Sequence, residues 1–147
     1  MKASVADLVE VELPEGAWRR FEGTSGALFA LEEDVSDASG DPMWTRFRVC
    51  VGVVEGGGDL RAVVDGLFRR RVRQGWVEPA DAIVAGRSGV RVDWVDGVAD
   101  WDSYFIDHPR GAIVELSFAA LIRPARKPRV RLEEVVPGIL SHVRWTA

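Results

Sequence analysis

The last third of the chain, residues 101–145, constrains the fold more than any other segment. Two apolar-rich stretches, at 103–107 and 112–122, flank the sequence HPRG at 108–111, which is typical of a tight turn. A basic, proline-punctuated linker at 123–131 follows, and beyond it apolar residues recur at helical spacing. This order predicts a β-hairpin that leads into an amphipathic helix at the end of the domain.

The closing helix is predicted over residues 131–144. Pro137 falls inside this pattern, where its ring removes a backbone donor. We therefore expect a kink at Pro137, or a helix that starts late, near Val136, unless only a single tight turn precedes the proline. The apolar stripe of the helix consists of Leu132, Val135, Val136, Ile139, Leu140 and Val143.

The upstream sequence predicts further strands and a second helix. Alternating side chains predict a strand at 8–13 and a longer one at 46–54, near the centre of a sheet. A glycine run ends the long strand, and Asp59 is placed to cap a helix over 59–74. The other expected elements are a strand at 27–32, a polar loop at 35–42, a hairpin with strands at 78–85 and 90–95 and its turn at 86–89, and a loop at 96–102.

These elements predict an α+β fold. We expect a central antiparallel sheet of about six to seven strands, flanked by helices at about 59–74 and 131–144. No internal repeat or domain boundary interrupts the pattern, and 147 residues are enough for one core. The prediction is therefore a single domain covering residues 1–147.

Composition excludes several classes of partner and site. A hydrophobic fraction of 47% with 29% charged residues is typical of an ordered globular domain, and a net charge of -4 offers no basic field for nucleic acid or anionic lipid. Cys50 is the only cysteine, which excludes an internal disulfide and multi-cysteine zinc motifs. Residues 1–20 lack the apolar run of a signal peptide, and no segment is long enough for stable membrane insertion. We expect a cytoplasmic protein; a domain cut from a longer secreted precursor is the alternative.

The order of the predicted elements resembles the PsbP-like superfamily, which includes the DcrB-like bacterial proteins. The segments that carry the resemblance are VELPEGAWRRF at 11–21, FRVCVGVVEGGGDLRAVVDGLF at 47–68, GRSGVRVDW at 86–94 and the block at 104–145. They span nearly the whole chain. What they share with the family is a pattern of residue types, and not a set of invariant reactive residues.

The resemblance implies a central antiparallel sheet flanked by helices, and a binding, assembly or chaperone role instead of an enzymatic one. One branch looks like the small cytosolic chaperones that load effectors of contractile secretion systems, and another consists of exported lipoproteins. The chain lacks a lipoprotein cysteine near its start, which favours the cytosolic branch. The resemblance supplies no catalytic residue and no cofactor.

Three groups of residues could in principle carry chemistry. Five aspartates around the predicted loop before the last hairpin could offer oxygen ligands to calcium or magnesium, but their spacing matches no calcium loop, so we interpret them as solvated loop acids. Cys50 and His108 with an aspartate would suit nucleophilic catalysis, but a cysteine in mid-strand is ordinarily a small buried thiol. The glycine run before Asp59 lacks the lysine and hydroxyl of a phosphate-binding loop. We therefore predict no catalytic residue and no metal site. The five aspartates are Asp93, Asp96, Asp100, Asp102 and Asp107.

Four residues are candidates for binding. Arg71 points into the apolar arc of its predicted helix, where its guanidinium can reach solvent or the last helix carbonyls, or a partner carboxylate in a groove. Three of the six tryptophans, Trp44, Trp76 and Trp101, fall in predicted loops or at element ends. Such side chains either anchor the core or form an interface or an apolar-ligand groove.

The hypothesis from these patterns is a non-enzymatic domain that binds a protein segment, as a chaperone or adaptor for a secreted or toxin-type partner. Its expected surface is the sheet face or a groove beside the helix at 59–74, and a homodimer through an unpaired sheet edge is a further expectation. The alternative is a small-ligand or lipid carrier with an apolar cavity between sheet and helix. A hydrolase built on Cys50 or the aspartates is the third hypothesis.

Overall fold

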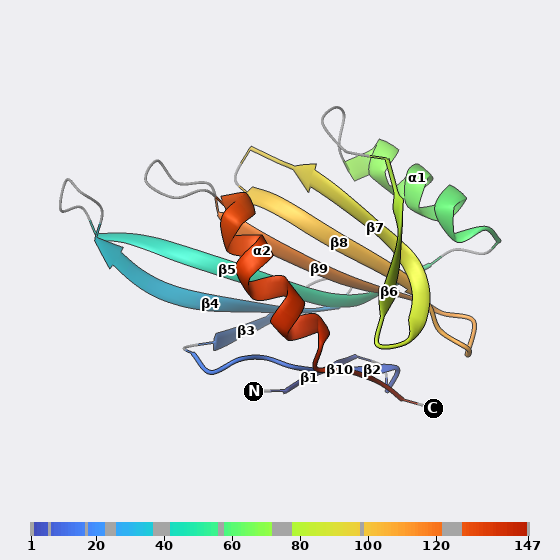
Figure 1. The fold of residues 1–147 in the computed structure, drawn as a ribbon, viewed down its shortest axis with the longest axis horizontal. Helices are drawn as coiled ribbons and strands as arrows, with labels where there is room; N and C mark the ends of the chain where they lie inside the picture. Colours follow the sequence, from blue (N-terminus) through green and yellow to red (C-terminus); the bar gives the residue numbers. More distant parts are fainter. Residues whose placement is uncertain are drawn as a thin grey trace.

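The computed structural model describes residues 2–5, 7–16, 18–22, 26–36, 42–55, 58–71, 78–97, 99–121 and 128–146. Within these ranges the chain has the predicted α+β fold, with an antiparallel sheet of seven strands in the order β3-β4-β5-β9-β8-β7-β6 and a small sheet in the order β1-β2-β10 (Figure 1). The strands of the large sheet are β3 (Trp18–Glu22), β4 (Gly26–Ser36), β5 (Pro42–Val54), β6 (Ala80–Val84), β7 (Arg87–Val95), β8 (Ala99–Asp107) and β9 (Ile113–Leu121). The remaining elements are β1 (Lys2–Val5), β2 (Val9–Glu12), β10 (Val143–Trp145), α1 (Leu60–Arg71) and α2 (Pro128–Leu140).

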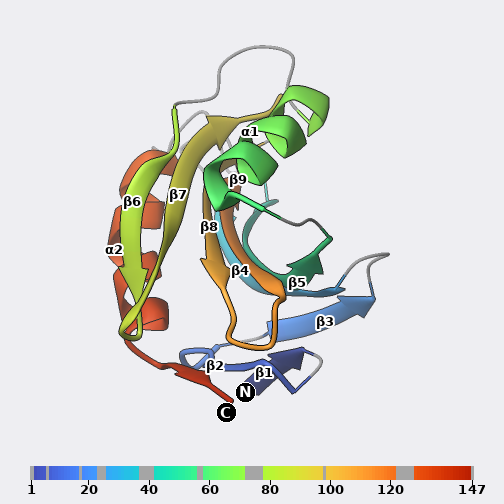
Figure 2. The ribbon, with the colours of Figure 1, turned by 90° about the vertical axis from the view of Figure 1, so that its right-hand side faces the viewer.

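The two helices lie on opposite faces of the large sheet. Figure 2 shows the sheet between them, with α2 against β8 and β9 and α1 against β7 and β8. The small sheet lies on the α2 side, next to the C-terminal end of that helix (Figure 1). The first and last strands both pair with β2, and the chain enters and leaves the small sheet at opposite ends of β2 (Figure 1). No helix in the described ranges combines the length and apolar character needed to cross a membrane.

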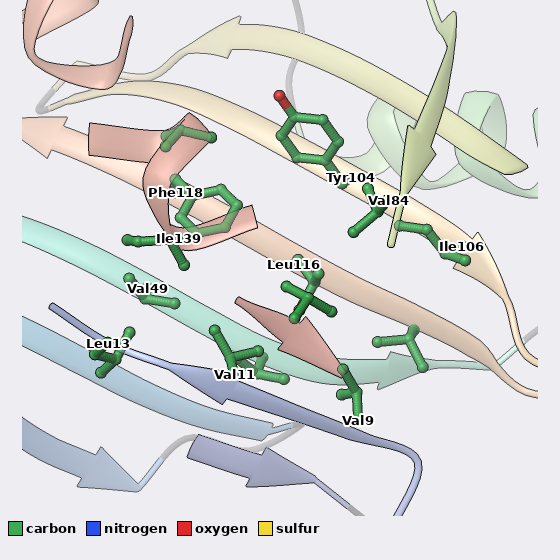
Figure 3. Close-up of a cluster of buried hydrophobic side chains, with 14 of the residues drawn as sticks. Val9, Val11, Leu13, Val49, Val84, Tyr104, Ile106, Leu116, Phe118 and Ile139 are labelled. Carbon is green, nitrogen blue, oxygen red and sulfur yellow. The ribbon is translucent and has the colours of Figure 1, made fainter. Parts of the chain in front are cut away.

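The main hydrophobic core fills the space between the large sheet, α2 and the small sheet (Figure 3). It forms because alternating residues of β5 share one face, as predicted, and meet the alternating residues of β9 and the apolar stripe of α2. Each such side chain stabilises the fold by about 1.5–3 kcal/mol when fully buried. Its buried members include Val9, Val11, Phe47, Val49, Val51, Leu116, Phe118, Leu132, Val136 and Ile139.

A second, smaller core lies under α1 on the other face. Phe68 is its centre, with ring centroids 5.8 Å from Phe105 and 5.5 Å from Trp94, both edge-on. The helix begins where predicted, since the Val63 amide donates to the Asp59 carbonyl at 3.1 Å. It is described to Arg71; the last residues of the predicted helix lie outside the described ranges.

Two predicted loops were placed wrongly. The first hairpin turns at Ala85 and Gly86, not at 86–89, with φ of 47° and 82°, the conformation that a two-residue turn requires. Gly89 is instead a residue of β7, and it must be glycine because a Cβ there would lie 2.3 Å from the carbonyl oxygen of Phe105. The predicted loop at 96–102 is also mostly strand, since β8 begins at Ala99.

The closing helix starts earlier than predicted. It begins at Pro128, a residue well suited to the first turn, so the predicted linker contributes its last residues to α2. The late start near Val136 is wrong: Pro137 lies inside the helix, which ends at Leu140. Beyond it the chain forms β10, where a helix was predicted. Strands β1 and β3 were also not predicted, and β4 extends into the predicted loop at 35–42, of which residues 37–41 lie outside the described ranges.

Candidate functional site

A groove of about 470 Å³ opens between the second half of α2 and the segment that follows β2. Its volume is within the roughly 300–1,000 Å³ that ligand sites occupy. It lies at the edge of α2 and not between the large sheet and the helix, where buried side chains of β9 and α2 form the main core. One wall is formed by Glu12, Leu13, Pro14 and Glu15, and the other by Glu134, Val135, Gly138, Ile139 and His142.

The bottom of the groove is apolar. Leu13 and Ile139 are buried members of the main core (Figure 3). Val135 packs against this core and is half-buried. Gly138 presents no side chain to the groove, and a Cβ at this position would meet no atom within 4 Å. The two walls are joined by a backbone hydrogen bond of 3.4 Å from the Glu12 amide to the His142 carbonyl.

The rim of the groove is acidic. Glu12 and Glu15 are exposed on one wall and Glu134 on the other, and the lining residues that the structure describes include no lysine or arginine. The Nδ1 atom of His142 lies 2.9 Å from the carbonyl oxygen of Gly138. Because a carbonyl only accepts, this nitrogen carries a proton. The groove therefore combines an apolar bottom with carboxylates at its rim.

The groove was not foreseen from the sequence, and Trp101, the one predicted binding residue whose side chain is described, does not line it. Trp101 lies on β8, half-buried, where its ring stacks on Trp94 at a centroid distance of 5.0 Å and its Nε1 donates to Asp96 at 3.0 Å. The backbones of Trp44, in β5, and Arg71, at the end of α1, are described but their side chains are not, and Trp76 lies outside the described residues. The signal that could have indicated the groove is the glycine directly after Pro137, inside an otherwise apolar helix.

The aspartates interpreted as solvated loop acids lie mostly on strands, and Asp102 is buried, with a side chain 3% exposed. Its partners are two guanidiniums: Arg129, from the first turn of α2, contacts Oδ1, and Arg91 on β7 lies 3.3 Å from Oδ2. Arg91 also donates to Asp93, the cross-strand neighbour of Asp102, at 2.9 Å. The interpretation was therefore wrong for Asp102, which joins α2 to the sheet.

The protonation of Asp102 follows from this position. Burial raises the pKa of its carboxyl group to about 6, Asp93 adds to the rise through a hydrogen bond and its charge, and Arg129 and Arg91 oppose it. Within the described ranges no group of three or more histidine, cysteine, aspartate or glutamate side chains could hold a metal ion. In this cluster the positive charge beside the carboxylates comes from the guanidinium groups of Arg91 and Arg129.

The second candidate for chemistry, Cys50 with His108, is not assembled. The ring of His108 is buried near the C-terminus, with Nε2 2.9 Å from the Thr146 carbonyl and Nδ1 accepting from the Arg110 amide at 3.2 Å. Both nitrogens are thus engaged by the backbone. Cys50 lies on the sheet face towards α1, opposite Ser117 of β9.

Buried hydroxyls on that face form a chain that the sequence did not reveal. Trp94 donates to Ser103 at 2.9 Å, Ser103 and Ser117 are 2.7 Å apart, and Ser117 donates to Glu115 at 2.6 Å. Each buried hydroxyl is therefore hydrogen-bonded, as burial requires. These hydrogen bonds satisfy the polar side chains that β7, β8 and β9 bury on this face.

The comparisons with known proteins found a similarity of fold and no similarity of sequence family. No family model matches the sequence, and no curated protein matches it. The solved structure of LpqN of Mycobacterium tuberculosis, described as involved in cell envelope biogenesis, is similar with a TM-score of 0.57 and 16% sequence identity. The likeness covers 95% of this chain and 83% of LpqN, so the two proteins share an architecture over nearly the whole chain.

Proposed function

We propose that this chain is a non-enzymatic domain that binds a segment of another protein in the groove between α2 and residues 12–15. The observation that carries the proposal is the groove itself, which offers an open apolar bottom between two walls fixed by the main core. The surface therefore differs from the sequence-based expectation, which was the sheet face or a groove beside α1.

In its finer form the proposal is a chaperone or adaptor for a secreted or toxin-type partner, within the PsbP-like and DcrB-like superfamily. The fold shared with LpqN supports this assignment, and a role in cell envelope biogenesis, as described for LpqN, is compatible with binding other proteins. The proposed location is cytoplasmic, and the envelope is the alternative that LpqN suggests. We propose no nucleic-acid partner and no stable membrane insertion.

A non-enzymatic role is supported by the state of the reactive side chains. The ring nitrogens of His108 are bonded to the backbone, and Asp102 is held by two arginines. In the proposed role these groups stabilise the fold and transfer no proton to a substrate.

Homodimerisation through a sheet edge remains part of the proposal. In the described part of the chain β6 pairs with β7 alone, and Ile83 in this strand is 75% exposed. An edge strand of this kind can add a strand from a second copy.

A second candidate function, a small-ligand or lipid carrier, is favoured by the volume of the groove, which matches that of small-molecule sites. Its ligand would lie beside α2 and not between sheet and helix. Native mass spectrometry of the purified protein tests this function: a retained lipid or small molecule that Gly138→Leu abolishes would replace the protein partner as the occupant.

Site-specific crosslinking in the source cell tests the main proposal. A photo-reactive amino acid at Glu15, on the rim, should capture a defined protein, whereas the same residue at the exposed Asp59 should not. The captured protein is then purified, and its affinity for the full chain is measured by calorimetry.

The matched variants are Gly138→Leu, which fills the groove, and Gly66→Leu, which places the same side chain in open space on α1. Binding should be lost in the first variant and kept in the second, with unchanged circular dichroism in both. Equal binding by the two variants would exclude the groove as the site.

A further inference from the structure

We infer that Trp145 is a positioning residue for the groove, because it fixes the C-terminal strap, residues 142–146, which holds the two walls together. The inference rests on the proposed function, to which it adds a residue that acts from outside the site. Trp145 itself does not line the groove.

The strap meets both walls of the groove. It starts at His142, which lines the α2 wall and whose carbonyl accepts from the amide of Glu12 on the other wall at 3.4 Å. Its middle residues form β10, which pairs with β2, the strand that leads into the first wall (Figure 1). At its end the Thr146 amide donates to the Leu8 carbonyl at 3.0 Å. The position of one wall relative to the other therefore depends on where the strap lies.

Backbone pairing alone is a weak hold on the strap. Strand β10 has three residues and lies at one edge of the small sheet. A strand this short makes few hydrogen bonds, and such pairing is marginal without packing against other elements. Val143 is buried in the main core, so packing holds the start of β10. The other end of the strand needs a contact of its own.

Trp145 supplies that contact with the large sheet. Its Nε1 donates to the carbonyl of Val84, the last residue of β6, at 3.0 Å. The guanidinium carbon of Arg87 lies 5.7 Å from the centre of the indole ring, and the ring of His108 lies 6.2 Å from it. The Thr146 carbonyl lies 2.9 Å from Nε2 of His108. The ring therefore combines apolar area, a donor and a cation contact at one position.

Loss of this contact should move the strap without unfolding the chain. Each wall keeps its own packing, because Leu13 and Ile139 are buried in the main core. Trp145 is half-buried and packs at the margin of that core. The position of the strap can therefore be tested separately from the stability of the fold.

Hydrogen exchange measured by NMR on the full chain tests the hold on the strap. In Trp145→Leu we expect the amides of Glu12 and Thr146, which bond across the strap, to exchange about tenfold faster than in wild type. The slowest amides of β5 and β9 should not change. Trp145→Phe keeps a ring and loses the donor, so its effect should be smaller. The matched control is Trp101→Leu, which removes a half-buried tryptophan on the opposite face of the sheet and should leave both amides as in wild type.

Fluorescence titration with Nile red, a neutral apolar dye, tests the consequence for binding. Binding in the groove is the part that Gly138→Leu abolishes and Gly66→Leu keeps. We expect Trp145→Leu to weaken this part about tenfold, because an occupant must then order walls that wild type holds in place. Trp145→Phe should weaken it less, and Trp101→Leu should leave it unchanged.

The two measurements separate the inference from the proposed function. If Trp145→Leu leaves either the two amides or the dye affinity at the wild-type level, the inference fails and the proposed function stands. An equal effect of Trp101→Leu would mean that any lost tryptophan loosens the molecule, and the inference would fail as well. If Gly138→Leu binds the dye as wild type does, the groove takes no apolar occupant and the proposed function fails; the exchange of Glu12 and Thr146 then still decides whether Trp145 positions the walls.

Discussion

Asp102 is a carboxyl group held out of water between two guanidiniums, one on the neighbouring strand and one on α2. Burying a charge lowers the stability of the fold unless the charge is paired, and Asp102 is paired with two arginines. Arg129 is the only one of the two that comes from a helix, so its contact with Asp102 also fixes where α2 begins on the sheet.

Replacing Arg129 with methionine tests this contact. Arg129→Met removes one partner of a buried carboxylate while keeping an apolar stem that favours helix. We expect the free energy of unfolding at neutral pH to fall by about 2 kcal/mol, less than for a fully orphaned charge because Arg91 remains. Urea unfolding measures the change. Arg69→Met, which breaks the exposed helical pair with Asp65 at 3.0 Å, is the control and should cost less than about 0.5 kcal/mol.

The raised pKa of Asp102 predicts a stability that depends on pH. The native-state pKa of about 6 lies above the value of about 4 for an unfolded aspartate, so the unfolded chain loses this proton first as the pH rises. The contribution to the free energy of unfolding is fully present below about pH 4 and lost as the pH passes 6. Relative to wild type, Asp102→Asn should therefore gain on the order of 2 kcal/mol between about pH 4 and pH 7. The free energies of unfolding of both proteins are measured in urea across this pH range. If they change with pH in the same way, the raised pKa of Asp102 is contradicted.

The burial of a residue was predicted correctly from the sequence where a local pattern determines it. Phe47, Val49 and Val51 were placed correctly on one face of a strand because their alternation is local. Asp102 was misjudged because its burial depends on a helix residue more than twenty positions away in the chain, which no local pattern encodes. The groove was missed for the same reason, since its walls come from opposite ends of the sequence.

At the scale of elements, α2 shows what pattern can and cannot determine. Its apolar stripe was predicted correctly, because helical periodicity selects the face that meets the core. Its ends were not, because Pro128 is tolerated in the first turn and because pairing with β2 converts the expected last helical turn into β10. Short strands such as β1 and β3 carry too little alternation to stand out, and their partners define them.

Pro137 limits the stability of α2. A proline inside a helix removes the hydrogen bond that its nitrogen would give to the carbonyl four residues earlier, here that of Glu133. Because Pro137 is exposed, Pro137→Ala should introduce no clash and should raise the free energy of unfolding by about 1 kcal/mol or more. Thermal unfolding measures the gain, with Gly66→Ala on α1 as a reference for an ordinary improvement in helix propensity. A loss of stability would show that the proline holds a bend that the main core requires.

At the scale of the whole molecule, one sheet serves two cores of unequal size (Figure 2). The face towards α2 also receives the small sheet, and its core includes one buried residue from each wall of the groove, Leu13 and Ile139. The face towards α1 is covered over β7 and β8 by a single helix. The groove therefore belongs to the more extensively packed half, which keeps its walls in place.

This division predicts that α1 opens before the rest of the molecule. Among the described residues, fewer buried side chains hold α1 than hold α2 and the small sheet, and local opening follows the packing that must be broken. In native-state hydrogen exchange, the amides of α1 should exchange through an opening that costs less free energy than the global unfolding reported by the amides of β5 and β9.

Phe68→Ala provides the decisive comparison. Removing the ring at the centre of the smaller core should cost about 3–4 kcal/mol locally and should abolish protection in α1. The slowest amides of β5 and β9 should remain protected, because the main core on the other face is intact. Binding of the captured partner in the groove should also persist in this variant. Equal loss of protection in α1, β5 and β9 would show that the two cores unfold as one unit, and that α1 stabilises the groove from across the sheet.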